Sequence, residues 1–310
     1  MCRILSYLGT PVLLDHLLYA PDMSLLNQTI HARMLAMLNL AGFGMAAWDP
    51  ASHEPHAPFR YRTTQVALFD RNLKALASKL QPAALLAHIR GVAYNSTVQI
   101  NEQNVHPFRF DGVPLAMAHN GDLVDFRAMR FDLVHHLKPE FARLIQGSTD
   151  SEWLYALTVS ALDNPYRVAT PEEILAAITR ALAIVREVRS QHGIDRSSST
   201  NLIFCDGVNL VAVRFTFDFG KSGDFSRPGG AQMQGTNEFL SMWYSFGRDY
   251  GLHDNEWKLT GGAARADSVI VASEPLTGDF ATWIEVPEYS ALLVRSDGAR
   301  RMAEIHALEV

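Results

Sequence analysis

The feature that most limits the fold of this 310-residue chain is the separation of its helix signals from its strand signals. Amphipathic helical periodicity dominates residues 126–193, whereas strand-like segments bounded by turn residues dominate the sequence beyond Thr200. A βαβ fold alternates helices with strands, and this sequence does not. We therefore expect an α+β fold in which helices flank two sheets. No internal repeat or linker-like tract divides the chain, so we expect one domain over residues 1–310.

Helix starts are the clearest local signals. Thr170, Pro171 and Glu173 combine a capping box with proline at the first helical position. Thr149 and Glu152 fit a second capping box, at the start of a helix over residues 148–162. The segments typical of strands are residues 45–48, 85–90, 114–118, 201–205, 210–217, 239–246, 268–272, 289–295 and 301–305.

Three further segments carry turn or loop signals. Asn120-Gly121 is the strongest hairpin or tight-turn signal in the chain, and Asp206-Gly207 predicts the turn of a second hairpin. Residues 91–103 form a polar loop of the kind that carries binding groups. Residues 219–265 are expected to be a mobile or inserted segment. The aromatic side chains of that segment either pack a core or an interface, cap a pocket, or bind a partner; they are Trp243, Tyr244, Phe246, Tyr250 and Trp257.

Composition argues against several classes of function. The net charge is -6 and no cluster of Lys and Arg stands out, so we expect no nucleic-acid partner. No apolar run approaches the roughly 18–20 residues of a membrane helix. The only cysteines, Cys2 and Cys205, cannot form a disulfide framework or a four-thiolate zinc site, which favours a reducing cytoplasm. The histidines are scattered, and we expect neither a metal nor a cofactor.

Cys2 is the first candidate for chemistry. A small second residue permits removal of Met1, and Cys2 then carries both a thiol nucleophile and an α-amine whose pKa of about 7.7–8.0 makes it a usable base. Two structural alternatives compete with this hypothesis: Cys2 is a buried residue at the start of a strand, or the segment is a signal peptide. Pro11 and Asp15 interrupt the apolar run early, which disfavours the signal peptide.

Three other residues invite a functional interpretation. Arg90 ends a buried strand, where a guanidinium usually pairs with a carboxylate of the protein or of a ligand. Asp150 lies in the first turn of a predicted helix, where an acid is favourable even without a ligand. His106 precedes Pro107 and is either a pocket residue or a core histidine bonded to the backbone.

Taken together, these motifs resemble the class II glutamine amidotransferases of the N-terminal nucleophile superfamily. The resemblance rests on Cys2, Arg90, His106-Pro107, Asn120-Gly121-Asp122 and Thr149-Asp150-Ser151-Glu152, whose order and spacing both agree. It covers roughly the first 300 residues and looks closest to a stand-alone subgroup. That subgroup includes the ergothioneine-pathway and yeast glutathione-degradation amidohydrolases.

The resemblance implies a four-layer αββα sandwich of two stacked, mainly antiparallel sheets, formed by a single glutamine amidotransferase type-2 domain. It also implies a role for each matching residue. Cys2 is the nucleophile that forms a thioester, and Asn120 with the backbone N–H of Gly121 forms the oxyanion hole. Arg90 holds the α-carboxylate of the substrate, Asp150 holds its α-ammonium group, and His106 shapes the pocket.

Three functions remain open at this point. The first is an amidohydrolase that acts alone on the γ-amide of glutamine or of a γ-glutamyl compound. The second is an ammonia-donating glutaminase subunit, for which no acceptor domain follows before Val310. That function requires a separate ammonia-accepting synthase as partner. The third is an inactive binding or scaffold protein, which would not need the combination of Cys2, Arg90 and Asn120. A homodimer is a further partner that the sequence leaves open.

Overall fold

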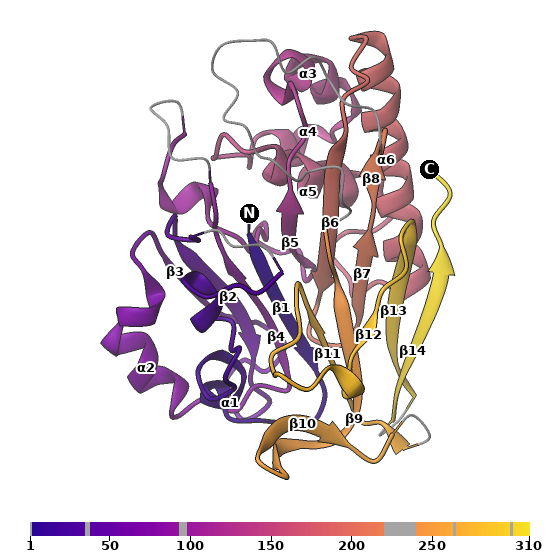
Figure 1. The fold of residues 1–310 in the computed structure, drawn as a ribbon. Helices are drawn as coiled ribbons and strands as arrows, with labels where there is room; N and C mark the ends of the chain where they lie inside the picture. The colour runs from indigo at the N-terminus through magenta and orange to yellow at the C-terminus, as the bar shows by residue number, and fades with distance from the viewer. Residues whose placement is uncertain (1, 35–37, 93–97, 220–239, 263–264, 298–299) are drawn as a thin grey trace.

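The computed structural model describes residues 2–34, 38–92, 98–219, 240–262, 265–297 and 300–310. Two sheets lie face to face, and helices cover the outer face of each, as Figure 1 shows. Every strand pairing among the described residues is antiparallel.

The first sheet has, in spatial order, β10 (Glu256–Thr260), β9 (Trp243–His253), β11 (Ser268–Ala272), β1 (Arg3–Leu8), β4 (Ala84–Ile89), β2 (Phe43–Trp48) and β3 (Phe59–Thr63), with β12 (Ile284–Glu285) paired to β9. The second sheet has β14 (Arg300–Ala307), β13 (Ser290–Asp297), β7 (Leu210–Arg214), β6 (Ser198–Cys205) and β5 (Ala116–Gly121), with β8 (Thr216–Phe217) paired to β6. Helices α1 (Leu14–Leu18) and α2 (Arg71–Ala77) cover the first sheet. Helices α3 (Phe126–Leu133), α4 (Pro139–Ala142), α5 (Asp150–Ala161) and α6 (Pro171–Gln191) cover the second.

Three apolar layers hold these elements together. The strands alternate their side chains between faces, so that in β1 Leu5 packs toward the helices and Ile4 packs toward the second sheet. The layer between the sheets is closed from the other side by residues such as Ile203 of β6. A third layer joins the second sheet to α3–α6. The resulting order of helix, sheet, sheet and helix confirms the predicted αββα sandwich.

The long helices agree with their sequence signals. Thr170 and Glu173 form the complete capping box of α6, and its apolar stripe, which the amphipathic periodicity of residues 126–193 predicts, is buried. In α5 the box is only half formed, because Thr149 caps Glu152 N while the Glu152 carboxylate accepts from Gln146 N and Gly147 N instead. Among the described helices, none combines bilayer-spanning length with enough apolar character.

The described part of residues 219–265 forms strands rather than a loop. Tyr244 packs in the layer between the sheets, and the Tyr250 ring contacts the Trp257 ring at 5.9 Å. Trp257 also contacts His16 of α1, with ring centroids 4.6 Å apart. The described aromatic residues therefore pack within the fold. The prediction of a mobile or inserted segment also concerns residues 220–239 and 263–264, which lie outside the described residues.

Candidate active site

Cys2 lies at the start of β1, in the interior of the first sheet, and is 9% exposed. Its thiol donates to the carbonyl oxygen of Gly91, with Sγ and O 3.5 Å apart. Burial raises the pKa of this thiol; the hydrogen bond to Gly91 and the Arg90 guanidinium lower it, and the Asp150 carboxylate raises it further. Cys2 therefore lies within electrostatic reach of two other predicted site residues.

A buried ion pair fixes the backbone of Cys2. Arg3 Nη1 donates to the carbonyl oxygen of Cys2 at 3.1 Å, and Arg3 Nε lies 3.8 Å from Glu274 Oε1. Glu274 also accepts from Met34 N at 2.8 Å. Removing one member of such a pair leaves a buried charge without compensation, which is strongly destabilising. Sequence reasoning missed the role of Glu274, whose only local signal is an acid that closely follows the apolar strand β11.

Arg90 is brought beside Cys2 by antiparallel pairing. Arg3 of β1 lies opposite Ile89 of β4, so the residue that follows β4 lies next to Cys2. Arg90 is 7% exposed, and its Nη1 donates to Gln99 O at 2.9 Å. Its backbone N–H donates to Gly42 O at 2.8 Å. Hydrogen bonds from both its backbone and its side chain thus fix the position of Arg90.

The second sheet contributes Asn120 and Gly121, because β5 contacts β1 and β4 across the sandwich. Figure 1 shows the N-terminal end of β1 beside β5. Asn120 is buried, and its Oδ1 accepts no hydrogen bond from the residues that the structure describes. The predicted Asn-Gly turn is wrong: both residues belong to β5 and lie opposite Asn201 and Thr200 of β6. The pairing with β6 overrides the local turn preference of the dipeptide.

Asp150 is the first residue of α5, directly after the cap Thr149. Its Oδ2 accepts from Leu123 N at 2.6 Å, and its Oδ1 accepts from Ser151 N at 2.8 Å. Both oxygens are therefore oriented by the backbone. The carboxylate retains lone pairs for a further donor, since each oxygen can accept more than one hydrogen bond.

His106 lies in a buried histidine pair. Its Nδ1 is 2.8 Å from His88 Nε2, and the two rings meet edge to face. Burial holds the pKa of both rings well below the ordinary value, and the neighbouring Arg90 charge lowers it further. Gly44 allows this packing, because a Cβ there would lie 2.1 Å from the carbonyl oxygen of His106. His106 is thus a neutral group close to Arg90.

Five of the six predicted site residues lie at or next to the starts or ends of β1, β4, β5 and α5, and His106 contacts His88 of β4. Arg90 and Asp150 each act electrostatically on the Cys2 thiol, and Arg90 also acts on the His106 ring. Asn120 and Gly121 enter from the facing sheet. Nowhere in the described ranges do three His, Cys, Asp or Glu side chains lie close enough together to hold a metal ion.

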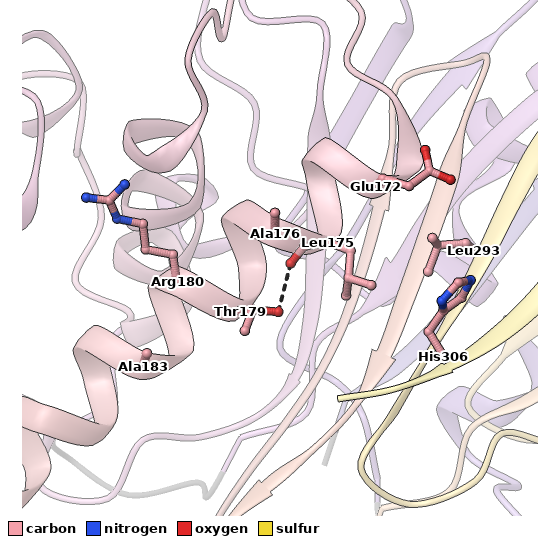
Figure 2. Close-up of a pocket in the computed structure, with 8 residues that line it drawn as sticks. All are labelled: Glu172, Leu175, Ala176, Thr179, Arg180, Ala183, Leu293 and His306. Atoms are coloured by element: carbon pink, nitrogen blue, oxygen red, sulfur yellow. Dashed lines mark hydrogen bonds between the residues drawn. The ribbon is translucent and has the colours of Figure 1, made fainter. Parts of the chain in front are cut away.

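A separate open groove of about 500 Å³ lies between α6 and the β13–β14 pair. Figure 2 shows its apolar floor, to which Leu175 and Leu293 contribute, and His306 at its side. The Thr179 hydroxyl, which lines the groove, already donates to Leu175 O at 3.0 Å. The groove includes none of the predicted site residues.

Comparisons with known proteins bear on the family and the fold. A family model described as "Glutamine amidotransferases class-II" matches residues 41–216. The chain is 29% identical to "Probable glutamine amidotransferase DUG3" of Saccharomyces cerevisiae over 95% of its own length and 82% of that protein.

Two solved structures share the fold. A protein from Silicibacter pomeroyi described as a glutamine aminotransferase class-II domain protein matches with a TM-score of 0.60 and 22% identity, over 99% of both chains. The glutamine phosphoribosylpyrophosphate amidotransferase of B. subtilis matches with a TM-score of 0.56 and 16% identity, over 98% of this chain and 49% of that one. At these identities the two structures support the architecture alone.

Proposed function

The chain belongs to the class II glutamine amidotransferases, enzymes that act on glutamine or γ-glutamyl amides, and we propose that it is an amidohydrolase using Cys2 as its nucleophile. In this proposal Met1 is removed, so that Cys2 becomes the N-terminal residue. The substrate is glutamine or a γ-glutamyl compound, and the carbon attacked is its γ-carbonyl carbon. The proposed compartment is the reducing cytoplasm, in keeping with the two free cysteines, Cys2 and Cys205.

The proposed reaction has two steps. The Cys2 α-amine takes the thiol proton through a water molecule, and Sγ bonds to the γ-carbonyl carbon. Asn120 Nδ2 and the Gly121 N–H donate to the resulting oxyanion. The carbon–nitrogen bond then breaks, the amine leaves with the proton, and a thioester remains. Water hydrolyses the thioester, which frees Cys2 and releases the γ-carboxylate.

Arg90 and Asp150 position the amino-acid end of the substrate in this proposal. The Arg90 guanidinium suits a carboxylate because it presents two parallel donors. The Asp150 carboxylate suits an ammonium group because its oxygens keep free lone pairs. His106 is neutral and lines the pocket close to Arg90.

One observation carries the proposal. A buried thiol at the second position of the chain lies within reach of a buried arginine and an oriented carboxylate. A purely structural cysteine needs neither charge, and both charges come from elements distant in sequence. A scaffold protein gains nothing from this arrangement.

The test is amine release from the purified protein offered glutamine, glutathione and other γ-glutamyl amides in parallel. Intact mass first establishes whether Met1 is absent. We expect turnover of at least one of these amides and a loss of at least about 1,000-fold in Cys2→Ala. A chain with an N-terminal extension before Met1 keeps the thiol but lacks the adjacent α-amine, and it should be similarly impaired.

Three other results would contradict the proposed mechanism or favour a different function. Turnover that persists in Cys2→Ala would rule out the thioester mechanism. Turnover of glutamine alone would favour an ammonia-donating subunit and a separate synthase partner. A processed protein with a free Cys2 N-terminus and no turnover of any of the amides would contradict the proposal of a stand-alone amidohydrolase.

A further inference from the structure

A buried hydrogen-bond link joins β5 to the first turn of α5. His119 Nδ1 and Ser151 Oγ lie 2.8 Å apart, and the two residues are 1% and 4% exposed. The Ser151 hydroxyl also contacts Asp150 Oδ1 at 3.3 Å. The tautomer of the neutral His119 ring decides whether Nδ1 donates to the Ser151 hydroxyl or accepts from it, and the contact links the two side chains in either case. His119 thus acts on Asp150 through Ser151.

A second hydrogen bond joins the same carboxylate to a residue that follows the proposed oxyanion donors in the chain. Leu123 N donates to Asp150 Oδ2 at 2.6 Å. His119 precedes Asn120 and Gly121 in the chain, and Leu123 follows them. The two links therefore bracket the oxyanion donors and tie both Asp150 oxygens to the segment that carries them.

This segment is itself rigid. β5 pairs with β6 along its whole length, from Ala116 opposite Cys205 to Gly121 opposite Thr200. Helix α5 is buried on every side over residues 151–159. Such close-packed surroundings restrict the movement of both the backbone and the side chains. The Asp150 carboxylate and the oxyanion donors consequently behave as one body with a fixed separation.

We propose that His119, Ser151 and the Leu123 amide set the distance between the ammonium-binding carboxylate and the oxyanion hole, so that the site accepts γ-amides and rejects β-amides. This inference rests on the roles proposed for Asp150, Asn120 and Gly121. His119 and Ser151 are positioning residues in it, because they act through Asp150.

The chemistry of the two substrates explains the selection. Glutamine has one more methylene than asparagine between its α-carbon and its amide. An asparagine amide seated in the oxyanion hole leaves its ammonium group short of Asp150 by about one carbon–carbon bond, roughly 1.5 Å. Discrimination by one methylene is typically about 10–200-fold. A carboxylate free to move could follow the shorter substrate and would lose that discrimination.

The test measures binding of L-glutamine and L-asparagine by calorimetry in a Cys2→Ala background, where no turnover interferes. We expect Ser151→Ala to weaken L-glutamine binding about 10-fold and to change L-asparagine binding by less than about 2-fold, so that the preference falls at least about 5-fold. His119→Ala should act alike, and the double variant should lose no more than either single one. His119→Asn places an amide nitrogen near the position of Nδ1 and should restore the preference.

Thr158→Val is the matched control. Thr158 is a buried hydroxyl residue of the same helix, and it donates to Leu154 O at 2.9 Å without contacting the site. This variant should keep the preference. An equal fall in Ser151→Ala and Thr158→Val would show a general loosening of α5 and overturn the proposal. Additive losses in the double variant, or a Cys2→Ala protein that does not bind L-glutamine, would also overturn it.

Binding and cleavage are measured separately, so this inference and the proposed function can fail independently. If the wild-type protein binds L-glutamine but cleaves no γ-glutamyl amide, the hydrolytic function fails while the binding preference still decides the inference. If cleavage is robust but the preference is unchanged in Ser151→Ala, the inference fails alone.

Discussion

At the scale of single residues, Gly121 shows most directly how the backbone shapes the candidate site. Its φ of +150° is rarely adopted by residues with a side chain, and a Cβ there would lie 1.8 Å from Ser199 O. The same Cβ would lie 2.9 Å from His119 Nε2. A side chain would therefore push β5 away from β6 at the residue next to Asn120.

We expect Gly121→Ala to lower the free energy of unfolding by about 3 kcal/mol, and to reduce γ-amide cleavage at least about 100-fold through displacement of the oxyanion donors. Urea denaturation and steady-state kinetics measure the two effects. Gly193→Ala is the control, since Gly193 also has a positive φ, but a Cβ added there would meet no described atom within 4 Å. Gly193→Ala introduces backbone strain without a steric clash and should lower the free energy of unfolding by about 1 kcal/mol. Equal effects of both substitutions would contradict the steric argument.

At the scale of elements, sequence patterns predict best where the stabilising partners are local. The capping box of Thr170 and Glu173 and the buried stripe of α6 depend on neighbours within a few residues, and both predictions are confirmed. The Asn120-Gly121 turn was wrongly predicted because the deciding partner, β6, lies some eighty residues further along the chain. The same limit hid Glu274, whose partner Arg3 is near the other end of the sequence.

The candidate site likewise contains residues that the sequence indicates and residues whose role only the structure shows. Cys2, Arg90 and Asp150 could be proposed because residue type, position and family resemblance all point to them. Ser151 belongs to the Thr149-Asp150-Ser151-Glu152 motif, but the motif does not indicate its role, since that role follows from a contact with His119 that the packing of α5 against β5 creates. His119 adjoins the Asn120-Gly121 motif, yet its position in the sequence does not identify Ser151 as its partner. The roles of such positioning groups follow from tertiary contacts that the motifs alone do not show.

A polar bridge between the sheets extends this point. Ser273 accepts from Ile4 N through its Oγ at 2.9 Å and donates its own N–H to Ile4 O at 3.0 Å. Its carbonyl accepts from Ser241 Oγ at 2.8 Å. Asn201, opposite Asn120 in the second sheet, donates to Leu240 O at 3.0 Å, directly beside Ser241. The bridge therefore runs from the strand after Cys2 to the strand beside the oxyanion hole.

We expect Ser273→Ala to reduce kcat about 10-fold to 100-fold with little change in KM, because it alters the alignment of Cys2 with the proposed oxyanion donors and leaves Arg90 and Asp150 in place. The variant also leaves the buried Ile4 N–H without its acceptor, which should cost about 1–3 kcal/mol of stability. Ser290→Ala is a matched control: Ser290 is buried and its hydroxyl donates to Pro287 O at 2.6 Å, in β13. A kcat loss of the same size in Ser290→Ala would refute a specific role for the bridge.

At the scale of the whole molecule, the interior contains histidines that remain neutral. Burial holds the pKa of His88 and His106 well below the ordinary value, and it also lowers the pKa of His119. Unfolding exposes these rings, which then bind protons near their ordinary pKa of about 6.5. Below that pH the unfolded state holds more protons than the folded state, so the free energy of unfolding must fall as the pH falls. Above it, neither state is protonated at these rings and the stability is fully present.

The fold should therefore weaken as the pH drops below about 6.5, by up to about 1.4 kcal/mol per pH unit for each of these histidines. Burial raises the pKa of Glu152 and Asp206, and these carboxylates act in the opposite direction at lower pH. The test is consequently a difference between variants: urea midpoints between pH 8 and 5 for the wild type, His106→Asn and His53→Gln. His106→Asn removes one buried histidine and should reduce the dependence of stability on pH by the contribution of that one residue. His53→Gln changes an exposed residue and should retain the pH dependence of the wild type. Identical slopes in all three proteins would mean that the buried rings take up protons without unfolding. Burial would then not lower the pKa of these histidines in the folded protein, which would contradict the prediction.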